Sequence, residues 1–419
     1  MTRKPATIAI VDGYSAGQNL LRATRRHGAR AIHIRSTCRW SETMAVPDLS
    51  LYDAAFDIID GNPTDSDRYL LERLNVVGVL PGQESAVEST DRLATALGLA
   101  ANDYQLTSAR RNKYEMNERV RATGLPAVAQ RAGSSPEELA RWVDRHTGYP
   151  AVVKPLDSAG TDGVVICYDR TALLTAAFEV LKGKNLFGKP NRQALAQEYL
   201  RGDEYIVDTV SRDGRHFICG IWKYSKRLQA SGKNLYDLDV LLDPSSPECR
   251  DMGKYAGLVL DALGIVEGPA HTEIIMTVDG PRLVEVGARL NGNMMDSFHD
   301  VCLGHNQADL TVRSVLDPDG FDEQTRDGIY RRHMPAAVFH GASEQEGTVD
   351  AVDSECLERI HALKSLHGVV VKYGPGDFLP RTVDLMTTSL KAYLCHPSSS
   401  QLEADLSGLR DLTLNLYRL

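Results

Sequence analysis

Short apolar runs alternate with longer mixed stretches of apolar and polar residues along the first hundred positions. The apolar runs have the length of buried strands, and the mixed stretches have the length of helices. They predict strands at Thr7–Val11, 31–34, 57–59 and 76–80, and helices at 18–27 and about 85–97. Strands that alternate with helices form a parallel sheet covered by helices. We therefore expect the chain to begin with a βαβ unit.

Capping residues, Gly and Pro mark the elements that follow. Ser108 is the expected N-cap of a helix that runs through Arg121 and ends at Gly124. A second helix is expected at Pro136–His146, with a proline in its first turn. The later pattern predicts a strand at 149–155, strands within 194–219, a helix at 245–263 and a hairpin of 272–277 with 282–286. The C-terminal part mixes strands, Gly/Pro turns and a final helix.

Composition narrows the class of protein. The 419 residues are 42% hydrophobic and 25% charged, which suits a soluble globular chain of about two to four packed units. No apolar run reaches the roughly 18 residues that span a bilayer, and the first residues lead directly into a strand. We therefore expect a cytoplasmic protein with no membrane partner. The net charge of −9 argues against nucleic acid, because phosphate backbones bind basic surfaces.

The seven cysteines are scattered, odd in number and form no CxxC. Neither a disulfide framework nor a zinc site is therefore expected.

Two glutamates fall on the two arms of the hairpin predicted around Asp279-Gly280, a strong turn signal. Glu273 and Glu285 can therefore point to the same face. Neighbouring buried carboxylates repel each other unless a cation lies between them, and Mg²⁺ suits them because it takes oxygen ligands and bridges to phosphates. The alternative is a hairpin with two solvated glutamates. Arg289, beyond the second arm, could stabilise a transferred phosphoryl group or be an ordinary surface residue.

A lysine at the end of a predicted strand precedes a loop of small residues. Lys154 offers a point charge, and the loop with Ser158, Gly160 and Gly163 offers a hydroxyl and backbone N–H groups. Together they suit a phosphate. The lysine precedes the loop and no Gly-Lys-Ser/Thr follows, so the segment is not a Walker A motif. A plain hairpin turn explains it equally well.

A third segment, residues 197–208, has the pattern of a strand, a tight turn and a strand. Backbone groups near Glu198 and Leu200 could meet an adenine, and Glu204 could accept hydrogen bonds from a ribose. Alone, this segment is not specific. Residues 12–17 follow the first strand, where ligand loops occur, but they are no GxGxxG. An ordinary turn is preferred there over a dinucleotide site.

Taken together and in this order, the three segments resemble the ATP-grasp superfamily. The resemblance extends over residues 5–310, and its motifs begin near Lys113. It is weak in the residues after 310. It is nearest to the amino-acid ligase branch, which includes dipeptide synthetases of the bacilysin type and carnosine-synthase-like enzymes. Residues 261–273 and the Glu-Val-Gly-Ala-Arg string at 285–289 are especially similar to that branch.

The resemblance implies an α/β protein: an ATP-grasp fold with an N-terminal Rossmann-like parallel-sheet domain. Four parts are expected. These are an N-terminal βαβ domain (1–108), linker helices with a small subdomain and phosphate loop (109–190), a large subdomain with the metal site (191–310) and a strand-rich C-terminal region packed on it (311–419).

The resemblance also implies roles for the residues quoted above. The implied contacts are Lys113 and Lys154 with the α- and β-phosphates of ATP, the loop of Ser158, Gly160 and Gly163 with the γ-phosphate, Glu198 and Leu200 with adenine, Glu204 with ribose, and Glu273 and Glu285 with Mg²⁺ or Mn²⁺. Arg289 and Lys154 would be catalytic, with Arg289 serving the acyl phosphate. One departure is Gly287, where many ATP-grasp enzymes carry a metal-binding Asn. Asn291 or Asn293 is the expected substitute.

The implied activity joins a carboxylate to an amine. The γ-phosphate passes to the carboxylate and the amine attacks the acyl phosphate, which releases ADP and phosphate and gives a dipeptide or amino-acid amide. The expected partners are small carboxylates and amines, amino acids above all, with a homodimer as the candidate assembly. The candidate substrate contacts are Glu84, Trp222, Lys226, His271 and Arg289. His271 could instead cap its strand, and the segment with Trp222 and Lys226 could be a surface loop.

Other interpretations are open. An ATP-grasp carboxylase or purine-pathway ligase would need a second phosphate or bicarbonate site, which we do not find in the sequence. A binding protein that lost catalysis would have no need for the intact lysines, glutamates and arginine. A nicotinamide oxidoreductase rests only on the N-terminal βαβ pattern.

Overall fold

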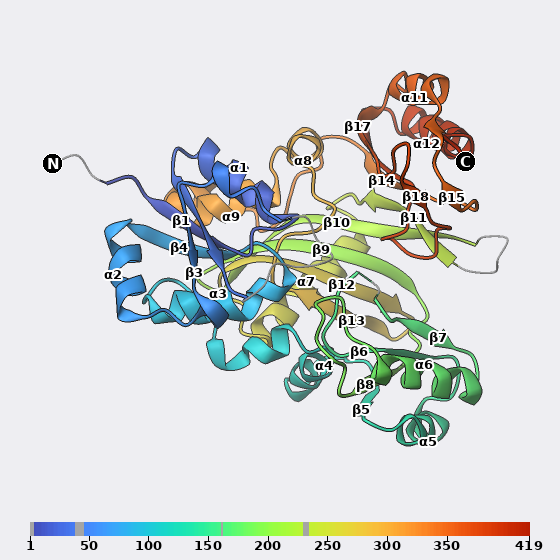
Figure 1. The fold of residues 1–419 in the computed structure, drawn as a ribbon, viewed down its shortest axis with the longest axis horizontal. Coiled ribbons are helices and arrows are strands. Elements are labelled where there is room, and N and C mark those ends of the chain that lie inside the picture. The colour runs from blue at the N-terminus through green and yellow to red at the C-terminus, as the bar shows by residue number, and fades with distance from the viewer. Residues whose placement is uncertain (1–3, 38–45, 161, 229–233) are drawn as a thin grey trace.

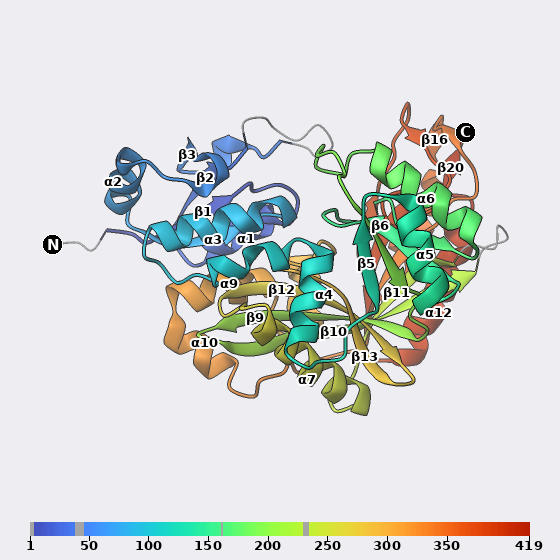
Figure 2. The same ribbon diagram turned by 90° about the horizontal axis from the view of Figure 1, so that it is seen from below.

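The computed structural model describes residues 4–37, 46–160, 162–228 and 234–419. Three sheets dominate it: a parallel sheet near the N-terminus, a small antiparallel sheet and a long antiparallel sheet. The N-terminal sheet lies at one end of the molecule, and the small sheet and the C-terminal region lie toward the other (Figures 1 and 2). Within the described ranges, no helix combines the length and the apolar character needed to cross a bilayer.

The N-terminal sheet is parallel, as the alternating pattern predicts. Its strands, in the order β3-β2-β1-β4, are β1 (Thr7–Val11), β2 (Arg30–Arg35), β3 (Ala54–Asp57) and β4 (Val76–Pro81). Its helices are α1 (Gly17–Arg26), α2 (Asp65–Arg73) and α3 (Val87–Ala96). The strand predicted at 57–59 lies earlier in the chain. Its prediction was wrong because Ile59–Gly61 curls into a 3₁₀ turn with Asp60 at a φ of 53°.

The helix predicted from residue 108 begins later. Tyr104–Arg110 is a 3₁₀ helix, and α4 spans Lys113–Ala122. Asn112 rather than Ser108 is the N-cap, because the Asn112 side chain accepts hydrogen bonds from two backbone N–H groups of the first turn. Lys113 thereby occupies the first position of the helix.

The small sheet has the order β5-β8-β6-β7. Its strands are β5 (Gln130–Gly133), β6 (Ala151–Pro155), β7 (Val165–Cys167) and β8 (Ala194–Glu198), and its helices are α5 (Pro136–His146) and α6 (Arg170–Lys182), which share one apolar core with it. Because β8 pairs with both β5 and β6, the boundary expected at 190/191 falls before the last strand of this sheet. We propose to end the small unit after Glu198.

The long sheet has the order β13-β12-β9-β10-β11-β14-β19-β17, and each neighbouring pair is antiparallel. Its strands are β9 (Asp203–Arg212), β10 (Arg215–Leu228), β11 (Asn234–Leu241), β12 (Gly268–Thr277), β13 (Gly280–Gly287), β14 (Ala336–Gly341), β17 (Leu366–Val371) and β19 (Leu390–Cys395). Three of them come from the C-terminal region, which therefore extends the large sheet.

The remaining helices are α7 (Pro247–Ala262), α8 (Asp296–Leu303), α9 (Gln307–Leu316), α10 (Pro318–Gln324), α11 (Ser354–His361) and α12 (Ser399–Thr413). Two short antiparallel pairs complete the strands: β15 (Gly347–Thr348) with β18 (Phe378–Leu379), and β16 (Ala351–Val352) with β20 (Tyr417–Arg418). The boundary expected at 310/311 falls inside α9. This helix packs between α1 and the long sheet, since its buried Ala308 and Val312 join the core of the N-terminal unit.

A buried arginine connects the N-terminal unit to the long sheet. The Arg110 side chain is 0% exposed and pairs with Asp91 of α3 at 2.7 Å. It also donates hydrogen bonds to the backbone carbonyls of Leu263, just after α7, and Asp103. A buried guanidinium is tolerated only when its donors are satisfied, as they are here by groups from three segments.

We predict that Arg110→Met lowers the free energy of unfolding by about 3–5 kcal/mol, because Asp91 is left as a buried, unpaired charge. Denaturant unfolding followed by circular dichroism measures the change. Arg331→Met is the matched control: Arg331 pairs with Asp327 on the surface, so its removal should cost less than about 1 kcal/mol. Equal effects of the two substitutions would contradict the bracing role of Arg110.

Candidate active site

Two carboxylates lie directly opposite each other on paired strands. Glu273 of β12 is the register partner of Glu285 of β13, and each side chain is 21% exposed. Side chains in direct opposition share one face and have Cβ atoms about 5 Å apart, so the expectation that both carboxylates point the same way is met. In the part of the chain that the structure describes, no three His, Cys, Asp or Glu side chains gather into a metal cluster.

Two lysines from other elements face this carboxylate pair. Lys113 Nζ lies 2.9 Å from Glu285 Oε2 and donates a hydrogen bond to the Ser158 carbonyl at 2.6 Å. Lys154, at the end of β6, is only 5% exposed. Burial lowers the pKa of Lys154 to about 8, although the negative charge of Glu285 acts to raise it. Burial alone would raise the pKa of Glu285, but the charges of Lys113 and Lys154 hold it well below its usual range.

A buried histidine holds one of the two carboxylates. His271 Nδ1 lies 2.8 Å from Asp208 Oδ1, and its Nε2 lies 3.4 Å from Glu273 Oε1. Burial would lower the pKa of His271, but its hydrogen bonds to Asp208 and Glu273 raise it to about 9. The imidazolium therefore bridges two carboxylates and fixes the orientation of Glu273. It lies inside β12 and does not cap the strand, which corrects that alternative.

A cavity of about 210 Å³ opens between the small and long sheets beside these charges. Its walls include the expected nucleotide contacts Lys113, Lys154, Ser158, Gly160, Glu198, Leu200 and Glu204, together with Lys226, Glu273 and Glu285. Apolar side chains, among them Val152 and Ile166, line it together with further polar groups such as Asp162 and Gln197. Gly163 does not line it, and Thr161 of the same loop lies outside the described residues.

Two glutamates of the cavity already have protein partners. Glu198 accepts a hydrogen bond from the Ala129 backbone N–H at 2.7 Å. Glu204 is bonded by Lys226 Nζ at 2.6 Å and by the Tyr236 hydroxyl at 3.0 Å. Burial raises the pKa of Glu204, although the positive charge of Lys226 acts to lower it. Lys226, expected at the substrate, thus lies beside the candidate ribose carboxylate.

The C-terminal region also reaches this cavity. Leu385 lines it, and a Cβ built on Gly160 would lie 3.4 Å from Met386 Sδ. Lys372 fixes this stretch by donating hydrogen bonds to the carbonyls of Leu385 and Met386 and to the Thr388 hydroxyl. The sequence pattern missed Leu385, because a leucine between turns carries no periodicity or charge that would single it out.

Arg289 and Glu84 form an ion pair outside this cavity. Arg289 Nε lies 2.9 Å from Glu84 Oε2, and Arg111 binds both Glu84 and Asp157. Burial would raise the pKa of Glu84, but the charges of Arg111 and Arg289 lower it. Sequence analysis assigned no role to Arg111, which lies two residues before Lys113. Glu84 is therefore engaged by two arginines.

This ion pair explains the glycine at position 287. A Cβ added at Gly287 would lie 2.8 Å from Glu84 Oε2 and 3.1 Å from Arg289 Cζ. An asparagine there would displace the pair. Asn291 and Asn293 do not take its place at the carboxylates. Asn291 donates to Asp208, and Asn293 donates to a carboxylate of β11, away from the cavity walls.

Trp222 lies away from the charged groups. It is buried, packs on Phe298 and His299, and borders a small gap next to Asp208. It does not line the cavity between the sheets. Trp222 instead belongs to the core of the long sheet, and its expected substrate contact stays a prediction.

Known proteins are similar to this chain in sequence and in fold. The sequence pattern of the ATP-grasp domain matches residues 147–296. Dapdiamide A synthase of Enterobacter agglomerans is 31% identical over 98% of this chain and 97% of its own length. An L-arginine-specific L-amino acid ligase of Bacillus subtilis is 22% identical over 55% of this chain and 56% of its own. The crystal structure of an L-amino acid ligase from Bacillus licheniformis has a TM-score of 0.75 at 20% identity and covers 98% of both chains.

The chain belongs to the ATP-grasp superfamily, in its amino-acid ligase branch. It is an ATP-dependent ligase that forms a carbon–nitrogen bond through an acyl phosphate and releases ADP and phosphate. Binding of ATP with a divalent cation follows from the same membership.

We predict that a non-hydrolysable ATP analogue with Mg²⁺ slows hydrogen–deuterium exchange in a peptide spanning 156–166. The reason is that the small residues of this loop bury little surface on their own and gain partners when phosphates bind. Mass spectrometry measures the exchange, and α2 provides the control peptide, whose exchange should not change. Equal exchange of the loop with and without nucleotide would count against a phosphate lid.

Proposed function

We propose that this ligase activates the carboxyl group of an amino acid with ATP and joins it to the amine of a second small substrate. The observation that carries the proposal is the cavity in which Glu273 and Glu285 face Lys113 and Lys154. Alternating charges around one cavity suit a phosphate chain with its cation. The words L-amino acid ligase in the names of two relatives support amino acids as substrates.

Glu273 and Glu285 fit a divalent cation. Both supply hard oxygen donors, they oppose each other on one face, and His271 holds Glu273 in place. Mg²⁺ commonly takes only one or two protein carboxylates and completes its shell with phosphate oxygens and water. We propose Mg²⁺, with Mn²⁺ as the second candidate. When bound, the cation would neutralise charge on the transferred phosphoryl group.

Lys113 and Lys154 would hold the inner phosphates. Both ammonium groups border the cavity, and Lys113 already bonds the Ser158 carbonyl at the start of the phosphate loop. A nucleotide phosphate at this position would replace Glu285 as the partner of Lys113 and leave that carboxylate to the cation. The loop would exclude water, which protects an acyl phosphate from hydrolysis.

Arg289 would stabilise the acyl phosphate, and Glu84 would position Arg289. The ion pair of Arg289 Nε with Glu84 holds the guanidinium in place, and planar forked donors match phosphate and carboxylate oxygens. Glu84 was expected as a substrate contact. Because two arginines occupy it, we propose positioning as its main role.

We predict that Glu273→Gln and Glu285→Gln each lower the rate of ADP release by more than about a hundredfold, because each removes a negative ligand of the cation. The assay supplies pairs of amino acids and limiting Mg²⁺, and circular dichroism checks the fold. Glu403→Gln, on the exposed face of α12, is the control and should leave the rate unchanged. A near-wild-type rate for either test variant would refute the metal assignment.

The chemical route has its own prediction. A substrate whose carboxyl group carries ¹⁸O should transfer one labelled oxygen to the released phosphate, because that oxygen makes the new P–O bond. Mass spectrometry of the phosphate, with amide formation measured in parallel, tests this. Label in AMP, or unlabelled phosphate together with genuine amide product, would show an adenylate route instead.

A further inference from the structure

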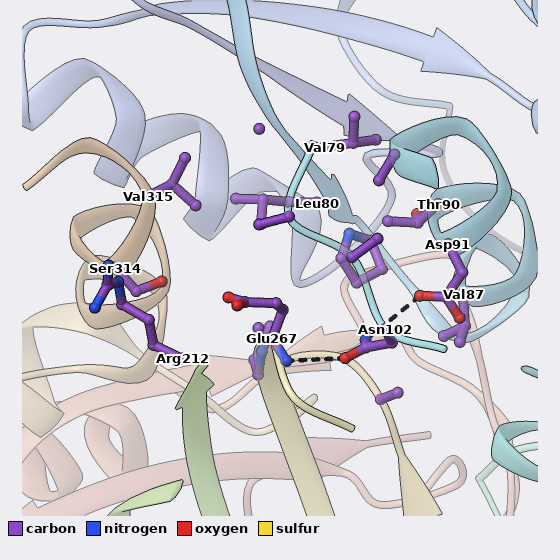
Figure 3. Close-up of a pocket in the computed structure, with 18 of the residues that line it drawn as sticks. Val79, Leu80, Val87, Thr90, Asp91, Asn102, Arg212, Glu267, Ser314 and Val315 are labelled. Carbon is purple, nitrogen blue, oxygen red and sulfur yellow. Dashed lines mark hydrogen bonds between the residues drawn. The ribbon is translucent and has the colours of Figure 1, made fainter. Parts of the chain in front are cut away.

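A second cavity, of about 180 Å³, lies between the N-terminal unit and the long sheet. Its walls come from β4, from α3 and the residues after it, from the β9 end at Arg212, from the start of β12 and from the end of α9 (Figure 3). It shares no lining residue with the cavity that holds the lysines and the carboxylate pair. The proposed reaction makes no use of it.

The walls combine apolar and polar side chains, and the Glu267 carboxylate points into the space. Figure 3 shows the Glu267 side chain reaching between Leu80, Val315 and Arg212. Glu267 Oε1 accepts a hydrogen bond from the Asp213 backbone N–H at 3.0 Å. No lysine or arginine among the described residues forms an ion pair with Glu267. Burial raises the pKa of Glu267, and the charge of Arg212, which lines the same cavity, offsets part of that rise.

The other polar groups of the cavity are largely occupied. Arg212 pairs with Asp213 at 3.2 Å and with Asp322 at 3.1 Å, so its charge is compensated. Asn102 Oδ1 accepts from the backbone N–H groups of Val266 and Glu267. Thr90 is the exception: it is 6% exposed, and its hydroxyl has no hydrogen-bond partner among the residues described. Asp91 and Asp213, which also line the cavity, are paired with Arg110 and Arg212. The cavity thus offers one carboxylate without a direct ion-pair partner and one unused hydroxyl.

Size and charge define the ligand that would fit. An apolar cavity of about 150 Å³ accommodates a molecule the size of benzene, so this one suits a body of a few carbon atoms. A half-buried carboxylate without a counter-ion gains most from a cationic hydrogen-bond donor. Both requirements are met by a short aliphatic chain that ends in an ammonium group.

The cavity lies directly behind the Glu84–Arg289 ion pair. Pro81 and Ala288 line it, and the chain continues from them to Glu84 and to Arg289. A ligand packed against both segments would brace the backbone on which this ion pair depends. Binding there would favour the arrangement with the pair formed, since a ligand stabilises the state that it binds best.

We propose that this cavity is an effector site for small aliphatic ammonium compounds, with Glu267 as the charge-recognising residue. The site is separate from the cavity assigned to ATP, and its binding step does not depend on the proposed reaction.

Isobutylammonium is the probe, titrated by calorimetry into the full chain without ATP. We expect saturable binding that Glu267→Gln weakens about tenfold or more, since a charge-assisted hydrogen bond is lost. Glutamine can still accept the bond from the Asp213 N–H, so this variant should fold. Ala101→Leu, which adds bulk to the wall, should also abolish binding.

Isobutanol, the neutral isostere, should bind at least about tenfold more weakly than the ammonium probe. Hydrogen–deuterium exchange should fall at residues 81–84 and 288–289 when the probe binds. The proposal is overturned by equal binding of isobutanol, by unchanged affinity of Glu267→Gln or Ala101→Leu, or by no binding at all. Without the probe, both variants should release ADP at the wild-type rate, because neither residue belongs to the proposed ligation site. Loss of probe binding with normal ADP release therefore tests the effector site separately from the proposed ligation.

Discussion

Two carboxylates held opposite each other on paired strands are the constraint around which the active site is arranged. Glu273 and Glu285 cannot separate without breaking the β12–β13 register, so their repulsion must be met by positive charge brought from elsewhere. The chain supplies it from three directions: Lys113 at the start of α4, Lys154 from the small sheet, and His271 within β12 itself. A bound cation would take over part of this compensation at the carboxylates, and a phosphate chain would then pair with the lysines.

Much of this could be read from the sequence because its signals are local. The hairpin was predictable from Asp279-Gly280, and alternation then places Glu273 and Glu285 on one face. The parallel N-terminal sheet was predictable from strand and helix alternation. The start of α4 was missed because Ser108 and Asn112 are both good caps, and only packing decides between them.

Other parts of the site depend on contacts between distant segments, which no local pattern encodes. Leu385 reaches the cavity between the sheets because β14, β19 and β17 extend the long sheet and carry the C-terminal region toward Gly160. Trp222 was placed at the substrate because of its neighbour Lys226. Trp222 packs in the core of the long sheet, whereas Lys226 lies further along β10, past an irregularity in its pairing with β11, and reaches the cavity. The sequence gives no sign that Glu84 has ion-pair partners, because the two arginines that bind it come from other elements.

A chain of ion pairs joins the three parts of the molecule. Glu84 follows β4 of the N-terminal unit, Arg289 follows β13 of the long sheet, and Arg111 connects Glu84 to Asp157 at the phosphate loop. Each charge in this chain has partners in a different part, so a shift of any one part disturbs the pairing of the other two. Arg111 and Glu84 thereby link the segment at Asp157 to Arg289. The glycine at position 287 fits the same logic, since a side chain there would occupy the space that this pairing needs.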